Sequence, residues 1–309
     1  MNLNPLTQIN LFEHKEIFNQ LYKLSKNDTL PNKILLSGEK GIGKSTLAYH
    51  LINLVLSENE EHPYDFENNK INPDNKSYKL ILNKSNPNFY LIDVLEEKKN
   101  IDINQIRELI INLNKSSFNN KKRFVLIDNI ELLNLNSINA LLKILEEPNE
   151  NINFILINNN KRVLPTLKSR CLNFKIFLTK DQSIRIVNQL LNDDINTIIN
   201  NKLFDYYATP GKLFKLIKLS EEYDLDLVNF DLKTTLTTII KDKIYKKDKS
   251  IIEIIYSFIE LYFRNNISIE NISLLKSYHY FLEKINNTRI YNLDEETLFM
   301  EFEDKILNG

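Results

Sequence analysis

The feature that most constrains the fold is a glycine-rich octapeptide between a short apolar run and a helix-forming stretch. Residues 38–45 read GEKGIGKS and match the phosphate-binding pattern G-x-x-x-x-G-K-[ST] at every position. The pattern requires a strand before it and a helix after it, and residues 34–36 and 47–56 meet that requirement. Only five glycines occur in the chain, and three lie in this motif: Gly38, Gly41 and Gly43. Because glycine gives the backbone a freedom that other residues lack, we predict a phosphate-binding loop here.

The parts of this motif have separate roles in holding a nucleotide. Backbone N–H groups converge on phosphate oxygens, and the N-terminus of the following helix favours their negative charge. We expect Lys44 to reach the β- and γ-phosphates, the Ser45 hydroxyl to help hold Mg²⁺, and Thr46 to complete the nucleotide-binding set. The expected ligand is ATP or ADP with Mg²⁺. A glycine turn that precedes a helix by chance is the alternative, and the scarcity of glycine disfavours it.

Strand-like and helix-like patterns alternate over the first two thirds of the chain. Short apolar runs that suit buried strands occupy residues 33–36, 89–94, 123–127, 153–157 and 172–177. Residues 103–113 place Ile and Leu on one helical face, and a later helix is expected to begin at an Asn136 cap and to stop at Pro148. Residues 57–88, rich in Asn, Glu and Pro, are typical of an irregular excursion. This alternation predicts an α/β domain with a five-stranded parallel sheet.

Strand-like runs cease after about residue 177. Helical patterns follow at residues 181–191, 196–207, 210–219 and 251–262. We therefore predict three domains: an α/β nucleotide-binding domain at 1–178, a small helical domain at 179–220 and an all-α C-terminal domain at 221–309.

A second apolar strand carries a candidate metal-associated carboxylate. Residues 124–127 end in Asp128, which is expected to order the Mg²⁺ shell beside the phosphate loop. Many P-loop ATPases place Glu directly after this Asp to activate water, but this chain has Asn129 there. A neutral amide can hold a water molecule and cannot take its proton. Glu131 is an alternative whose direction the sequence leaves open, and we expect weak or absent intrinsic ATP hydrolysis.

Composition excludes several classes of protein. The net charge is −1, from 40 basic and 41 acidic residues, so any contact with nucleic acid needs a local basic face. A single cysteine, Cys171, excludes internal disulfides and multi-cysteine zinc sites. No apolar run approaches the ~18 residues of a membrane span, and the first residues lack the pattern of a secretory signal. We expect a cytoplasmic protein with no membrane partner.

Motifs in the first half of the chain resemble the AAA+ clamp-loader subunits of bacterial DNA polymerase III. They are SINALLKILEEP at residues 137–148, FILI at 154–157 and PTLKSRC at 165–171. Two further stretches are similar to the delta-prime subunits of that family. They are LPNK at residues 30–33, leading into the phosphate loop, and NPNF at 86–89 followed by IDINQIREL at 101–109. The resemblance covers residues 5–178.

The resemblance implies roles for individual residues. In this family the arginine of the SRC motif acts in trans, so Arg170 is expected to reach ATP held by a neighbouring subunit as an arginine finger. Asn158 resembles the polar sensor that contacts the γ-phosphate or the hydrolytic water. Cys171 is expected to be a small buried hydrophobe rather than a nucleophile. Motor subunits carry a sensor arginine where this chain has Gly211, which leaves Lys212 as a displaced substitute, and they carry four zinc-binding cysteines that are absent here.

The resemblance also implies an architecture and partners. It predicts an AAA+ P-loop domain, a helical lid at 179–220 and a collar at 221–309 through which subunits form a hetero-oligomeric ring. The expected function is that of a stator: a clamp-loader subunit that helps to load the sliding clamp onto primer–template DNA. A motor ATPase of the gamma/tau type is the first alternative. A P-loop kinase acting on a small molecule is the second.

Overall fold

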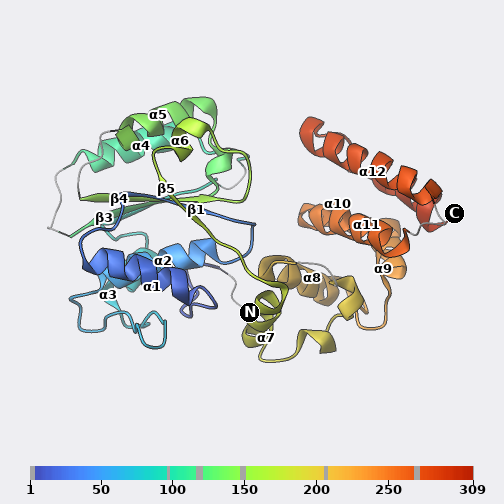
Figure 1. Cartoon of the computed structure of the whole chain (residues 1–309), viewed down its shortest axis with the longest axis horizontal. Helices are drawn as coiled ribbons and strands as arrows, with labels where there is room; N and C mark the ends of the chain where they lie inside the picture. The colour runs from blue at the N-terminus through green and yellow to red at the C-terminus, as the bar shows by residue number, and fades with distance from the viewer. Residues whose placement is uncertain are drawn as a thin grey trace. The chain divides into compact units, whose positions relative to one another are not determined.

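A computed structural model describes residues 4–95, 98–115, 121–146, 151–204, 208–267 and 272–308 (Figure 1). Within it the chain divides into two compact units, Met1–Leu178 and Thr179–Gly309. No helix in the described parts of the chain combines the length and the apolarity needed to cross a bilayer.

The first unit is built on a five-stranded parallel sheet, which confirms the predicted α/β class. Its strands are β1 Lys33–Ser37, β2 Phe89–Ile92, β3 Arg123–Ile127, β4 Ile152–Asn158 and β5 Leu172–Lys175. They lie in the order β2-β3-β4-β1-β5, and all neighbouring pairs are parallel. Every residue of β3 and β4 is buried, as expected for the centre of a sheet covered on both faces.

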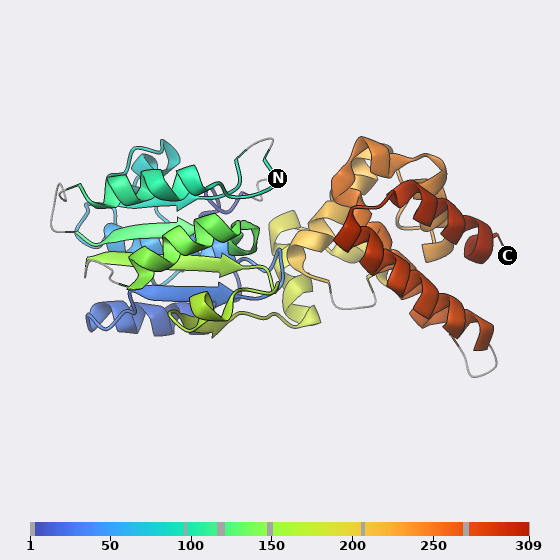
Figure 2. The same ribbon diagram turned by 90° about the horizontal axis from the view of Figure 1, so that it is seen from above.

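Helices cover both faces of this sheet. Figure 1 shows α1, α2 and α3 on one face and α4, α5 and α6 on the other, and Figure 2 shows α4 and α5 from above. Their bounds are α1 Lys15–Lys26, α2 Lys44–Leu56, α3 Lys76–Leu82, α4 Ile103–Leu113, α5 Leu135–Glu146 and α6 Pro165–Lys168. Between α4, α5 and the sheet lies an apolar cluster whose members include Ile106, Leu141 and Phe154, all fully buried.

Two local predictions for the first unit are wrong. The cap of α5 is Asn134 rather than Asn136: the Asn134 Oδ1 accepts a hydrogen bond from the Ser137 backbone N–H at 2.8 Å. Residues 57–88 contain the helix α3, which the side chain of Asn75 caps by accepting from the Tyr78 N–H. The predicted stop of α5 at Pro148 lies outside the described residues.

The described residues of the second unit form helices joined by turns and loops, with no strand among them. Its helices are α7 Lys180–Leu191, α8 Pro210–Tyr223, α9 Leu232–Lys241, α10 Ile244–Lys247, α11 Ile252–Asn266, α12 Ile272–Tyr291 and α13 Glu295–Phe302. The helix predicted at 196–207 is wrong where the structure describes it, because only two short 3₁₀ turns occur there, Ile195–Thr197 and Asn201–Leu203. The short polar side chains of Asp194 and Asn200 cap those turns and divert the backbone from a continuous helix.

One apolar cluster extends through this unit, from Val187 on α7 to Leu307. Phe263, Phe281 and Phe302 lie within it with ring centroids 5.2–5.9 Å apart, and each is at most 1% exposed. Residues on both sides of position 220 share this core. The described residues of this part of the chain thus form one compact unit with no separate core on either side of position 220, and the division into a lid at 179–220 and a collar at 221–309 stays a prediction.

Candidate nucleotide site

The phosphate loop follows β1 directly, at the carboxyl end of the sheet. The Gly38 N–H donates to the Asn158 carbonyl at 3.2 Å, which ties the start of the loop to β4. Gly38 has no room for a side chain, since an added Cβ would lie 2.3 Å from the Ile176 carbonyl oxygen. Gly41 and Gly43 have φ values of 86° and 90°, in the left-handed region that favours glycine. Gly38 thus allows the backbone to approach Ile176 closely, and Gly41 and Gly43 allow the left-handed conformation of the loop.

Lys44, the first residue of α2, is buried under this loop. Its Nζ donates to the Gly38 carbonyl at 2.9 Å, the Glu39 carbonyl at 2.5 Å and the Asn159 Oδ1 at 3.0 Å. Only 3% of the residue is exposed, and this burial lowers the pKa of the ammonium to about 8. Lys44 is therefore a cation held at the centre of the loop by oxygen atoms.

Ser45 and Asp128 meet beside the lysine. The Ser45 Oγ donates to the Asp128 Oδ2 at 2.6 Å, and burial raises the pKa of the Asp128 carboxyl. Mg²⁺ usually takes one or two protein oxygens and completes its shell with water and phosphate, so this pair fits it. Within the described ranges, no cluster of three or more His, Cys, Asp and Glu is placed to hold a metal ion. Thr46, half-buried, lies in the same first turn of α2.

Asn159, which no motif in the sequence identifies, connects the polar groups at the ends of three strands. Its Oδ1 accepts from Lys44, and its Nδ2 donates to the Asn129 Oδ1 at 2.7 Å and the Glu131 Oε1 at 2.8 Å. Asn129, with φ 55°, donates in turn to the Asp93 Oδ1 at 2.8 Å. Both polar ends of the Asn129 amide are thus engaged, and Glu131 faces this network.

Asn158, the predicted sensor, makes different contacts. Its Nδ2 donates to the Lys161 carbonyl at 3.0 Å, and its Oδ1 accepts from the Lys161 N–H at 3.2 Å. These bonds close a turn after β4 and leave Asn159 as the amide against Lys44. Residues 158–160 are all asparagine, so the sequence pattern alone does not distinguish Asn158 from Asn159 as the sensor. Position relative to the end of β4 was the available signal.

Arg170 lies after α6, on a different part of the first unit. Its Nη2 donates to the Glu146 Oε1 at 2.7 Å and its Nη1 to the Thr166 carbonyl at 2.8 Å. About a third of its side chain is exposed, at 32%. Neither bond involves the phosphate loop. Beside it, burial raises the pKa of the Cys171 thiol to about 11, which disfavours a nucleophilic thiolate at neutral pH.

Comparison with known sequences decides the family. The profile of the family described as "DNA polymerase III, delta subunit" matches residues 13–179, more than half of the chain. The chain belongs to this family. The match confirms the resemblance to clamp-loader subunits of DNA polymerase III that the motifs indicated.

Named relatives of this delta-subunit family member include both delta-prime and gamma subunits. DNA polymerase III subunit delta' of Pseudomonas aeruginosa is 32% identical over 138 residues, which are 44% of this chain and 40% of the relative. DNA polymerase III subunit gamma of a Buchnera aphidicola strain is 28% identical over 205 residues, 65% and 54% of the two chains. The chain thus spans about half, or less, of the length of these curated relatives.

A solved structure shares the fold. The DNA polymerase III gamma subunit-related protein from Thermotoga maritima superposes with a TM-score of 0.50 at 19% identity, covering 91% of this chain and 96% of its own. In the present chain, Gly211, which stands where motor subunits carry a sensor arginine, is the second residue of α8, and the neighbouring Lys212 is exposed.

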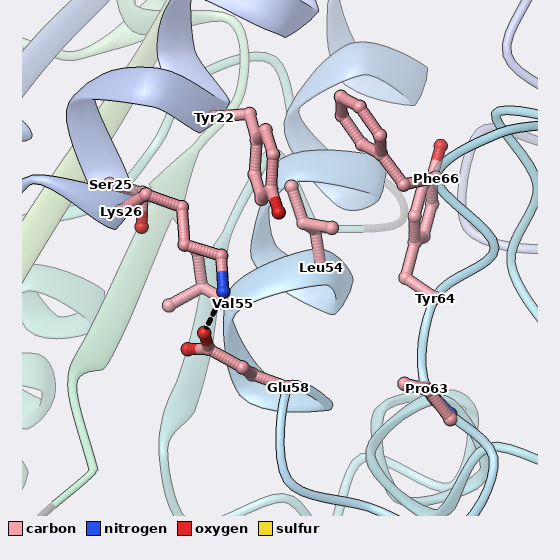
Figure 3. A pocket seen from close by; sticks show the side chains of 9 residues that line it. All are labelled: Tyr22, Ser25, Lys26, Leu54, Val55, Glu58, Pro63, Tyr64 and Phe66. Atoms are coloured by element: carbon pink, nitrogen blue, oxygen red, sulfur yellow. Dashed lines mark hydrogen bonds and ion pairs between the residues drawn. The ribbon is translucent and has the colours of Figure 1, made fainter.

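A small pocket of the first unit lies away from the phosphate loop. Its volume is about 160 Å³, and Figure 3 shows the ion pair of Lys26 and Glu58 at its side. The residues that line it are Tyr22, Ser25, Lys26, Leu54, Val55, Glu58, Pro63, Tyr64 and Phe66. Leu54 follows Lys44 by ten residues of α2, about 15 Å along the helix at 1.5 Å per residue. This pocket is therefore separate from the candidate nucleotide site.

Proposed function

We propose that this chain is a delta-prime-like clamp-loader subunit of DNA polymerase III that binds ATP or ADP with Mg²⁺ and presents Arg170 to a neighbouring subunit. The printed names of its relatives, subunits delta' and gamma of DNA polymerase III, support the assembly. The observation that carries the proposal is that two candidate sites lie apart on one unit. A complete phosphate loop lies at the end of the sheet, and a partly exposed guanidinium lies elsewhere, after α6.

The nucleotide would be held by the loop and by Lys44, and Ser45 and Asp128 would hold Mg²⁺. Backbone N–H groups of the loop supply the anion site, and Lys44 supplies the charge. Asn159 is the better-placed sensor, because its amide contacts Lys44. When bound, Mg²⁺ would neutralise phosphate charge.

Hydrolysis by this chain is proposed to be weak. The position after Asp128 holds an amide whose donor is committed to Asp93 and whose oxygen accepts from Asn159. Glu131 accepts two hydrogen bonds from Asn159, from its backbone and its side chain. A general base must take a proton from the attacking water, and the Asn129 amide has no basic group to offer. The Glu131 carboxylate keeps acceptor positions beyond these two bonds, so the proposal of weak hydrolysis rests on Asn129.

Arg170 is proposed to act on another subunit's nucleotide. A guanidinium stays charged at any physiological pH and donates in a fixed fork that matches phosphate oxygens. In the isolated chain that fork is held by Glu146 and Thr166, at the surface rather than at the chain's own loop. Other clamp-loader subunits in a ring, the sliding clamp and primer–template DNA complete the proposed set of partners.

Reconstitution with partner subunits tests this proposal. We expect Arg170→Ala to leave nucleotide binding by the purified chain unchanged and to lower the DNA-stimulated ATPase of the complex by 10³-fold or more, about the contribution of an arginine finger. Arg170→Lys keeps the charge without the fork and is expected to restore little. An unchanged rate in the Arg170→Ala complex refutes the finger. Turnover of several per second by the purified chain alone favours the motor alternative.

A further inference from the structure

A buried histidine from outside the motif contacts the phosphate loop. His14 precedes α1, is 7% exposed, and its Nε2 lies 2.5 Å from the Ile42 carbonyl oxygen. A carbonyl oxygen can only accept, so Nε2 carries the hydrogen and donates it. The backbone of His14 is itself fixed, since its N–H donates to the Phe12 carbonyl and its carbonyl accepts from the Phe18 N–H. The backbone that carries the ring is therefore held in place, and the buried ring donates to the loop.

This hydrogen bond determines the direction of a loop N–H group. In a planar trans peptide, the carbonyl of residue 42 and the N–H of residue 43 point in opposite directions. His14 draws the Ile42 carbonyl toward α1, so the Gly43 N–H points the other way. The N–H groups of such a loop are its phosphate ligands. Without His14, the same peptide could rotate and remove one donor from the site.

The loop is shaped to admit the ring. Gly43 has φ 90°, and a Cβ added there would lie 3.3 Å from the His14 Nε2. Gly43 thus suits this position in two ways: its backbone is in the left-handed region, and it has no Cβ to crowd the ring. Burial lowers the pKa of His14, with Lys44 adding a smaller effect in the same direction. Glu13 and the bond to Ile42 act in the opposite direction.

We propose that His14 is a positioning residue of the nucleotide site, which orients the Ile42–Gly43 peptide so that its N–H faces the phosphates. The inference rests on the proposed nucleotide binding and deepens it. Preorganisation of this kind lowers the ordering cost that the ligand otherwise meets on binding. A histidine that only packs α1 against α2 would affect stability and leave affinity unchanged.

The test compares nucleotide affinity with stability in single variants of the purified chain. His14→Ala removes the donor, His14→Gln replaces it with an amide of similar reach, and His14→Asn supplies a donor that is too short. The readouts are the dissociation constant of a fluorescent ADP analogue and the unfolding midpoint without nucleotide. We expect His14→Ala to weaken binding by about tenfold, which corresponds to about 1.4 kcal/mol. We expect His14→Gln to stay within about threefold of wild type, as one retained hydrogen bond predicts.

His50→Gln is the matched control. His50 is likewise buried in the first unit, on α2, and its ring contacts the Tyr64 hydroxyl and the Gln8 carbonyl rather than the loop. We expect this variant to lower the midpoint and to keep wild-type affinity. If His14→Ala does not fold, the Gln and Asn variants decide, with Asn expected to bind several-fold more weakly than Gln.

Three outcomes overturn the inference, and one of them also overturns the proposed nucleotide binding. Wild-type affinity in His14→Ala, or equal affinity in the Gln and Asn variants, refutes the positioning role while nucleotide binding stands. Absence of binding by the wild-type chain refutes the nucleotide site itself, and the role of His14 falls with it.

Discussion

Nucleotide affinity is expected to fall as the pH rises from 7 to 9, because Lys44 loses its charge over that interval. Burial lowers the pKa of this ammonium to about 8, below its ordinary value of 10.5. Phosphates favour the charged form, so the pKa is higher in the complex, and binding takes up the proton that the free chain has lost. With a free-chain pKa of about 8, the charged fraction drops from roughly 90% at pH 7 to roughly 10% at pH 9. The affinity therefore falls about tenfold, or about 1.4 kcal/mol.

Titration of a fluorescent ADP analogue at pH 7, 8 and 9 and constant ionic strength measures this loss. Calorimetry at pH 8.5 in two buffers of different ionisation heat is expected to show uptake of about three quarters of a proton. Lys44→Arg is the control, because a guanidinium keeps its charge throughout this range. We expect that variant to bind more weakly at pH 7 and with little dependence on pH. A wild-type affinity that stays constant from pH 7 to 9, or an equal slope in Lys44→Arg, refutes the reasoning.

Three further predictions concern stability. Acidification from pH 7 to 5 is expected to lower the free energy of unfolding by about 2 kcal/mol in urea titrations. Burial lowers the pKa of His50 to about 4, so between pH 6.5 and 5 this histidine gains a proton in the unfolded chain and stays neutral in the folded one. Gly38→Ala is expected to lower the thermal midpoint of the first unit and to impair nucleotide binding, because its Cβ would collide with the Ile176 carbonyl. Phe281→Ala is expected to cost about 3–5 kcal/mol in urea unfolding, as for other fully buried rings.

Each of these predictions has a control in the same chain. His50→Gln removes one titrating group and is expected to reduce the pH dependence without abolishing it, because burial lowers the pKa of His14 as well. A curve as steep as that of the wild type would assign the loss to other groups. Gly211→Ala, near the start of α8 and with no positive φ, is expected to leave the midpoint unchanged or to raise it slightly, in contrast to Gly38→Ala, because Ala is the better helix former. Phe177→Ala, at a side chain that is 78% exposed, is expected to cost less than about 0.5 kcal/mol. A Phe281→Ala cost as small as this would refute the packing argument.

The strands and the phosphate loop were predictable because their sequence patterns depend on local backbone geometry. Each predicted strand falls on an observed one, and α4 has the predicted bounds, Ile103–Leu113. The asparagine-rich composition limited the rest, since asparagine suits caps, turns and irregular segments equally well. Asn75 caps a helix inside a stretch that looked irregular, and Asn134 rather than Asn136 caps α5.

Site residues that depend on tertiary pairing could not be predicted in the same way. Asn159 reaches Lys44 because β4 lies next to β1, and no pattern along the chain contains that pairing. His14 contacts the loop from 28 residues before Ile42, through the packing of α1 against α2. Periodicity places these residues on elements. Their partners follow from the order of the strands and from the packing of the helices.

Strand β1 is synthesised first among the strands and finds its neighbours last. It pairs with β4 and β5, whose residues follow it by more than a hundred positions. The loop after β1 therefore gains Asp128, Asn159 and the Ile176 carbonyl only when most of the first unit has been made. Contacts of such sequence separation form slowly, because the intervening chain must close first. A ligand at this loop would bind only the completed sheet, so nucleotide binding would report that the first unit has finished folding.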